Sequence, residues 1–129
     1  MNRLGKREPE IYGEQTFDQY LSQLREMYTD HKIDYFQSNH EGEIIDSIHR
    51  WGDIEDGIII NPGGLTHTSV ALRDAIASVS APFVEVHISN IYSREQFRHH
   101  SYVSAVCRGC IAGLGLSGYE YALKSLLKG

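Results

Sequence analysis

The sequence of 129 residues lacks several features that mark special classes of protein. It has no low-complexity tract and no run of like charges. Its 41% hydrophobic and 22% charged residues are typical of globular proteins, which excludes intrinsic disorder. The longest uncharged apolar stretch, residues 57–60, is far below the roughly 20 residues that a membrane helix needs, and residues 1–5 do not resemble a signal peptide. We therefore expect a cytoplasmic protein without a membrane partner.

Basic residues are also in short supply, with 12 Lys and Arg against 17 Asp and Glu and a formal net charge of -5. Nucleic-acid binding requires a basic surface that releases counterions, so nucleic acid is not expected as the main partner. Any anionic ligand must then meet a local cationic cluster. The length suits one domain with one core and is too short for two ordinary domains, which predicts a single domain over residues 1–129.

Only two cysteines are present, and Cys107 and Cys110 form a C-x-x-C motif. Such a motif is compatible with a redox or zinc site. The two residues fall in the apolar run 106–112, however, and residues three apart in a strand point to opposite faces. We therefore interpret both cysteines as structural and predict no metal site.

Hydrophobic periodicity predicts alternating helices and strands. Thr16 and Gln19 form a capping box that begins a helix ending at about Asp30. A second amphipathic helix over residues 39–51 ends before Gly52. The other predicted elements are strands at residues 32–37, 57–61, 82–87 and 109–113, helices at residues 66–78 and 118–127, and a short helical turn at residues 94–100. The charged residues 5–15 are predicted to form an exposed, mobile loop.

This alternation predicts an α/β fold with a parallel sheet and right-handed crossovers. The expected architecture is a flavodoxin-like three-layer sandwich with strand order 2-1-3-4-5. That order begins with a buried strand before the first helix, and no apolar run precedes Phe17. Either the fold is a four-strand variant or the first strand is missing from this chain.

Polar side chains follow the ends of two predicted strands, where open α/β sheets bind ligands. Asn61 and His67 follow one strand, and His87 and Ser89 follow the next. Each has an ordinary structural interpretation when taken alone. Their predicted convergence at one edge of one sheet favours a binding or catalytic site.

A cationic cluster is predicted beside these residues. Arg94 and Arg98 are four residues apart and would share one helical face, from which they can bind a carboxylate. The alternative is an exposed face on which they pair with Glu95. Arg7 and Tyr12 can likewise be ordinary loop residues, and Asp74 an exposed helix position.

Six segments resemble the type II 3-dehydroquinate dehydratase family, and they stand in the family's order over essentially the whole chain. The longest is NPGGLTHTSVALRDA at residues 61–75. The others are LGKREPEIYG at 4–13, QSNHEG at 37–42, VEVHISN at 84–90, REQFRHHS at 94–101 and GLGLSGY at 113–119.

The resemblance implies a hydro-lyase of the shikimate pathway of aromatic amino acid and chorismate biosynthesis. It converts 3-dehydroquinate to 3-dehydroshikimate by anti elimination through an enolate, without metal or cofactor. Tyr12 would be the base, acting as tyrosinate. A free phenol titrates near ~10, so the anion would need the Arg7 guanidinium, with Arg94 adding to the field. His87 would be the general acid, held by Glu85.

The resemblance also implies how the substrate is bound and how the protein assembles. The backbone N–H groups of Ile88 and Ser89 would bind the substrate carboxylate. Asp74 would reach a neighbouring site across a trimer interface, in a homododecamer of four trimers. Three side chains would bind the ring hydroxyls: Asn61, His67 and Arg98.

The chain departs from the family at its start. Family members open with an apolar strand and an Asn-Gly-Pro-Asn turn before Arg-Leu-Gly, which stands here at residues 3–5. The resemblance therefore implies an N-terminally shortened chain without an asparagine that stabilises the enolate. Losing one such donor typically costs about 10²–10³ in rate.

Three other interpretations stay open. The chain could be a truncated, inactive relative that only assembles. It could be a metal-dependent hydrolase using His67, His87, Glu85 and Asp74, although no H-x-H or H-E-x-x-H spacing is present. A receiver-like module is disfavoured because Asn61 stands where a receiver has an aspartate.

Overall fold

The computed structural model describes residues 16–128, and these residues fall into two units. One unit extends to Asn39 and the other begins at His40. The predicted loop over residues 5–15, with Arg7 and Tyr12, lies outside the described residues.

The first unit contains the helix α3 (Phe17–Met27). Its capping box is confirmed, because the Gln19 N–H donates to Thr16 Oγ1 at 3.2 Å and the Thr16 N–H donates to Gln19 Oε1 at 3.0 Å. The helix ends at Met27, three residues before the predicted end, because Tyr28 leaves helical geometry with φ -118° and ψ 58°.

The predicted strand at residues 32–37 is wrong: these residues belong to no strand in the described part of the chain. A strand exists only as part of a hydrogen-bonded ladder. Here the Ile33 carbonyl accepts instead from the Arg25 guanidinium, at 3.0 Å from Nε and 2.8 Å from Nη2. The alternating pattern of apolar and polar residues predicted a strand, but such a pattern does not specify a neighbouring strand with which the segment can pair.

The second unit is built on a parallel sheet whose described strands have the order β1-β2-β3. They are β1 (Ile58–Ile60), β2 (Phe83–His87) and β3 (Gly109–Ala112). All five residues of the central strand β2 are buried. The register pairs Glu85 of β2 with Ile60 on one side and with Cys110 on the other.

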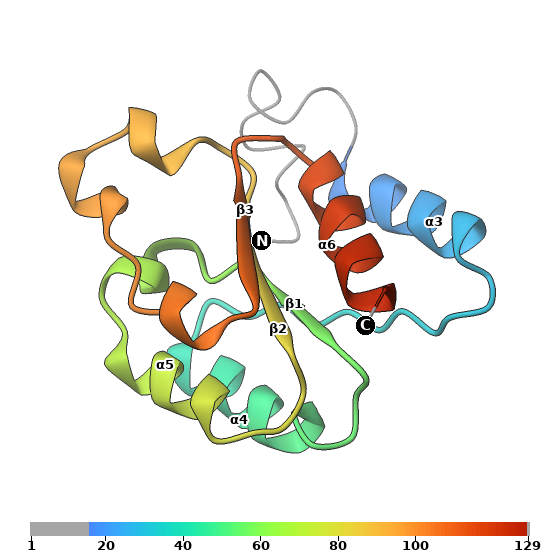
Figure 1. The fold of residues 1–129 in the computed structure, drawn as a ribbon, viewed down its shortest axis with the longest axis horizontal. Helices are drawn as coiled ribbons and strands as arrows, with labels where there is room; N and C mark the ends of the chain where they lie inside the picture. Colours follow the sequence, from blue (N-terminus) through green and yellow to red (C-terminus); the bar gives the residue numbers. More distant parts are fainter. Residues whose placement is uncertain (1–15, 129) are drawn as a thin grey trace. The chain divides into compact units, whose positions relative to one another are not determined.

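Helices cover both faces of this sheet (Figure 1). The helices α4 (Glu41–Trp51) and α5 (Val70–Ala77) pack on one face, where Ile48, Leu72 and Phe83 share a buried core. The helix α6 (Ser117–Leu127) lies on the other face and approaches β2 so closely that a Cβ at Gly118 would be 3.3 Å from Val86 Cγ1. The predicted three-layer α/β architecture is therefore confirmed in this unit.

Two connections differ from their predicted form. The predicted helix over residues 66–78 is a 3-10 turn, η1 (Gly63–His67), followed by α5. The break falls at Ser69, whose Oγ caps α5 by accepting the Leu72 N–H at 2.9 Å. The predicted turn over residues 94–100 is a shorter 3-10 turn, η3 (Gln96–His99), and a separate 3-10 turn that was not predicted, η2 (Ile91–Ser93), precedes it.

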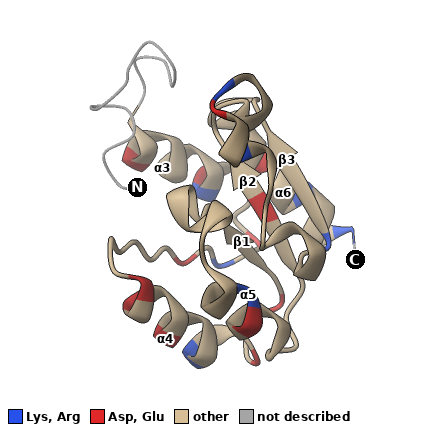
Figure 2. Ribbon diagram, turned by 90° about the vertical axis from the view of Figure 1, so that its left-hand side faces the viewer, with Lys and Arg blue, Asp and Glu red and all other residues tan. Residues whose placement is uncertain are grey.

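Charged residues of both signs are spread along the described ribbon, and in α4 they follow the helix dipole (Figure 2). Glu41 and Glu43 lie in its first turn and Arg50 in its last. Among residues 16–128, no helix is both long and apolar enough to span a bilayer.

Candidate active site

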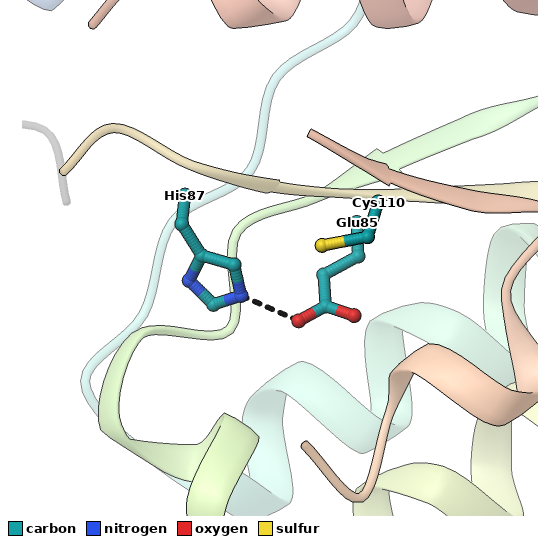
Figure 3. A group of neighbouring side chains, drawn as sticks. All are labelled: Glu85, His87 and Cys110. Carbon is teal, nitrogen blue, oxygen red and sulfur yellow. Dashed lines mark hydrogen bonds and ion pairs between the residues drawn. The ribbon is translucent and has the colours of Figure 1, made fainter. Parts of the chain in front are cut away.

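The site is centred on two side chains of β2 that point to the same face of the sheet. Residues two apart in a strand share a face, which places Glu85 and His87 together. Glu85 is 0% exposed and His87 is 5% exposed. Their side chains form a short hydrogen bond between His87 Nε2 and Glu85 Oε2 (Figure 3). The sequence predicts both as site residues, and the structure brings them together.

A segment between η3 and β3 supplies further hydrogen-bond donors to the buried carboxylate. The Ser104 hydroxyl donates to Glu85 Oε1 at 2.5 Å, and the Ser101 hydroxyl lies 3.2 Å from Oε2. The Ser101 oxygen in turn accepts the backbone N–H groups of Val103 and Ser104, both at 3.0 Å. Each Glu85 oxygen is therefore hydrogen-bonded, as a buried charge requires.

These contacts keep the carboxylate ionised. Burial is the largest influence and raises the pKa of Glu85. The hydrogen bonds from His87, Ser104 and Ser101, together with the charge of a protonated His87, outweigh it and hold the pKa below the ordinary value of 4.5. Since an ionised carboxylate only accepts hydrogen bonds, His87 Nε2 carries a proton and donates it.

The same segment orients a second imidazole. His67 Nδ1 lies 2.8 Å from the His100 carbonyl oxygen, which accepts only, so His67 also carries its proton on a fixed nitrogen and keeps Nε2 as an acceptor. The two imidazoles are stacked, with ring centroids 6.4 Å apart and planes at 21°. The segment is anchored by the Tyr102 N–H, which donates to the Thr66 carbonyl at 2.8 Å. Residues 100–104 thus set the tautomer of His67 directly and hold the Glu85 carboxylate that sets the tautomer of His87.

Asn61 lies directly after β1, and both the nitrogen and the oxygen of its side-chain amide are hydrogen-bonded. Its Nδ2 donates to the Tyr119 hydroxyl at 2.9 Å, and its Oδ1 accepts the Gly63 N–H at 3.2 Å. Gly63 has φ +58°, a backbone conformation that favours glycine. The turn therefore fixes the amide beside the end of the strand.

The two arginines are arranged differently from the prediction. Arg94 ends η2 in extended geometry, with φ -107° and ψ -159°, so it shares no helical face with Arg98. Arg94 Nη1 donates to the Ser89 hydroxyl at 3.4 Å. Arg98 pairs with Glu95, lowering the pKa of that carboxyl, and stacks over the Phe97 ring at 4.7 Å. The pairing with Glu95 is the alternative that the sequence left open.

The remaining predicted residues are placed as follows. Ile88 is buried directly after β2, and its carbonyl accepts the Gly115 N–H at 3.0 Å. Asp74 lies on α5 with its side chain 67% exposed, 3.8 Å from Arg73. Arg7 and Tyr12 lie outside the described residues.

Four contributors to the site had no predicted role: His100, Ser101, Ser104 and Tyr119. The sequence signal that points to such residues is Glu85. A carboxylate that is predicted to be buried in an apolar strand needs hydrogen-bond donors around it. The sequence does not say which distant residues provide them.

The two cysteines do not share one strand, contrary to the prediction. Cys107 precedes β3, so it is not a strand residue and the opposite-face argument does not apply to it. Burial and the nearby Glu85 charge raise the pKa of the Cys107 thiol to about 12 and that of the Cys110 thiol to about 11. Both are free thiols, and these pKa values disfavour redox chemistry at neutral pH.

The hydrolase interpretation is not supported by this arrangement. Of its four proposed ligands, Asp74 is exposed and paired with Arg73, and His67 Nδ1 is taken by a backbone carbonyl. Within residues 16–128, Asp74 and His67 are absent from the ligand cluster that contains Glu85 and His87.

The fold and the site together define a flavodoxin-like α/β protein with a buried carboxylate–imidazole pair at the carboxyl edge of its sheet. The sequence model of the family "Dehydroquinase class II" matches residues 1–127. A relative from Actinobacillus pleuropneumoniae serotype 5b, named 3-dehydroquinate dehydratase, is 55% identical over 126 residues, which cover 95% of this chain and 81% of the relative. A relative of the same name from Bacillus pumilus is 50% identical over 129 residues, covering 98% and 88%.

Solved structures agree with these sequence relatives. The crystal structure of type II dehydroquinase from Butyrivibrio crossotus matches with a TM-score of 0.91 and 46% identity, covering 98% of this chain and 90% of that one. The chain belongs to the type II dehydroquinase family.

The Glu85 carboxylate makes stability depend on pH in one direction. Because its pKa is lowered on folding, the stability that it contributes is present in full above its ordinary pKa of 4.5 and is lost as pH falls through the lower folded-state pKa. We expect Glu85→Gln to cost about 1–3 kcal/mol at neutral pH. It should also flatten the loss of stability below pH 4.5. Urea unfolding of both proteins across the acidic range measures this, and parallel pH profiles would contradict it.

Proposed function

We propose that this chain is a 3-dehydroquinate dehydratase, which eliminates water from 3-dehydroquinate to give 3-dehydroshikimate through an enolate, as the third step of the shikimate pathway. The observation that carries the proposal is the buried Glu85–His87 pair at the sheet edge. The family membership and the names of the relatives support the same reaction.

The pair suits general acid catalysis. Glu85 accepts from His87 Nε2, which leaves Nδ1 as the nitrogen that can exchange a proton with substrate. The imidazolium form of such a ring can donate a proton to a departing hydroxyl, and the hydrogen bond to Glu85 fixes the direction in which Nδ1 points. Ser101 and Ser104 keep the carboxylate in place while the ring charge changes. His87 is thus the proposed acid, and Glu85 its positioning partner.

The substrate-binding roles extend this proposal to the neighbouring residues. His67 offers Nε2 as an acceptor for a ring hydroxyl, because its Nδ1 is held by the His100 carbonyl. Asn61 presents an amide fixed by Tyr119 and Gly63. Arg98 would complete the hydroxyl contacts, the N–H groups of Ile88 and Ser89 would bind the carboxylate, and Arg94, in contact with Ser89, would add positive charge.

The base completes the reaction. Tyr12 is proposed as the tyrosinate that removes the proton next to the ketone, and Arg7 as the cation that stabilises its anionic form. A guanidinium close to a phenol lowers the phenol pKa toward neutral pH. The proposed reaction needs no metal or cofactor, because the proton acceptor and the proton donor are both side chains.

The activity and the acid are tested together by supplying 3-dehydroquinate and following the conjugated enone absorbance of the product. Since a positioned general acid contributes about 10²–10⁴ in rate, His87→Ala should lower kcat by that factor. The matched control is His49→Ala, an exposed histidine on α4, which should retain turnover. Equal activity of His87→Ala and wild type would refute the proposed role, and no turnover by wild type would favour an inactive relative.

The base is tested at Tyr12 and Arg7. We expect Tyr12→Phe to abolish turnover, because phenylalanine has no ionisable group, whereas Tyr121→Phe at an exposed position should not. Arg7→Ala should act by raising the phenol pKa, so its defect should shrink as the pH of the assay rises. A defect that is constant with pH would show that Arg7 does not act through the base.

We further propose a homododecamer of four trimers, in which Asp74 serves the neighbouring protomer's site. The exposure of Asp74 on α5 supports a role outside its own chain. Light scattering should report twelve protomers. Asp74→Ala and His87→Ala should each be inactive alone, yet trimers mixed from both should regain activity at about one quarter of their sites. Mixtures that stay inactive would place Asp74 in its own protomer's site.

A cytoplasmic location is part of the proposal. The free thiols Cys107 and Cys110 suit a reducing compartment, in which disulfides are rare. Fractionation of cells tests the location, and recovery in an extracytoplasmic fraction would contradict it.

A further inference from the structure

Cys110 lies beside the Glu85–His87 pair, and the proposed reaction makes no use of it. It is the register partner of Glu85 on the adjacent parallel strand, so both side chains point to the same face of the sheet. One ligand atom from each of Glu85, His87 and Cys110 lies within 4.8 Å of the other two (Figure 3). Glu85 and His87 are buried, whereas Cys110 is exposed on β3.

The three side chains offer an oxygen, a nitrogen and a sulfur ligand. Thiolate and imidazole ligands select zinc-like cations over magnesium and calcium, which prefer oxygen. In a tetrahedral zinc site the metal–ligand distances of about 2.0–2.3 Å place ligand atoms roughly 3.5 Å apart. The His87 and Glu85 atoms already meet in a hydrogen bond. Because all three ligand atoms lie within 4.8 Å of one another, the Cys110 sulfur needs to move by only about 1 Å to reach this spacing.

We propose that Glu85, His87 and Cys110 form a binding site for a zinc-class divalent cation, and that the bound cation inhibits the dehydratase. The inhibition rests on the proposed function, whereas the binding does not. Cys110 would be the ligand that the cation meets first, because it is the exposed member of the cluster.

Charge and protons balance in this step. The cation replaces the proton on Cys110 Sγ, which goes to water, and bonds to the resulting thiolate. It also binds His87 Nε2 in place of the proton there. In the neutral ring that proton is transferred through solvent to Nδ1, so the coordinated imidazole stays neutral with its one proton on Nδ1. The thiolate and the Glu85 carboxylate together supply two negative charges, which neutralise the dication in a buried setting.

Coordination would stop the proposed acid from working. His87 must alternate between imidazole and imidazolium, with Glu85 accepting from Nε2 in both forms. A metal on Nε2 leaves only the weakly acidic Nδ1 proton of a neutral ring to be donated, and it engages the carboxylate that positions the ring. The reversible result would be an enzyme that is folded but inactive.

The chain contains a matched control for the thiol. Cys107 precedes β3 and packs half-buried against the core on the α4–α5 side of the sheet, and it is absent from the ligand cluster. Cys110→Ala and Cys107→Ala each remove one thiol with the same loss of volume. Neither residue has a role in the proposed reaction.

Binding is tested on the full chain without reference to activity. Titration with Cd²⁺ should produce thiolate-to-cadmium charge-transfer absorbance that saturates at one ion per protomer. The band should be lost in Cys110→Ala and kept in Cys107→Ala, and His87→Ala should weaken the binding. No band in wild type, or a band that persists in Cys110→Ala, would overturn the site.

Inhibition is tested with Zn²⁺ in the enone assay. Zn²⁺ should inhibit wild type and Cys107→Ala, and a chelator should restore their turnover. Removing even a residue that only orients a metal ligand costs about 10–100-fold in affinity. Cys110→Ala should therefore raise the half-inhibiting concentration by at least about tenfold without losing its basal activity. Metal binding without inhibition would overturn the inhibitory role. An inactive wild type would count against the proposed function. In that case the cadmium titration would still show whether the metal site exists.

Discussion

The structure of the second unit depends on one constraint, which is a charged carboxylate in the middle of a fully buried strand. Glu85 is 0% exposed, and burying an isolated charge costs far more free energy than the net free energy of unfolding of a small domain. Its hydrogen bonds with His87, Ser101 and Ser104 make the burial possible. Removing one partner from such a cluster is expensive, because the others remain buried. The segment that carries the two serines is therefore as necessary to the fold as it is to the site.

This constraint joins parts of the chain that are distant in sequence. The segment at residues 100–104 donates to Glu85 through its serines and accepts from His67 through the His100 carbonyl. One short stretch thus fixes His67 directly and supports His87 through Glu85. A shift of the segment would disturb the two tautomers together. Pre-organisation of this kind is what a proton-transfer site needs, because misplacement by even about 1 Å weakens catalysis.

Sequence patterns predicted the elements whose signals are local. The capping box at Thr16, the end of α4 before Gly52 and the central strand β2 all depend on residues close in sequence, and all are confirmed. The predictions failed where hydrogen bonds outside a strand ladder, or a helix cap inside a predicted helix, interrupted a regular hydrophobic pattern. Residues 32–37 alternate like a strand, but the Ile33 carbonyl bonds to Arg25. The pairing of Glu85 with His87 followed from the period of two, whereas the serine donors come from a loop that no local rule places.

The strand β2 shows why the pair sits where it does. One face carries Val86, which packs against α6 at Gly118, and the other carries Phe83 in the core with α4 and α5. Glu85 and His87 continue the Phe83 face toward the carboxyl end of the strand, so the core changes to a polar site within two residues. Because both faces of β2 are covered and both its neighbours are hydrogen-bonded to it, the pair rests on a rigid part of the described fold. Rigidity of the strand then defines the position of His87 Nδ1, and the chemistry depends on that position.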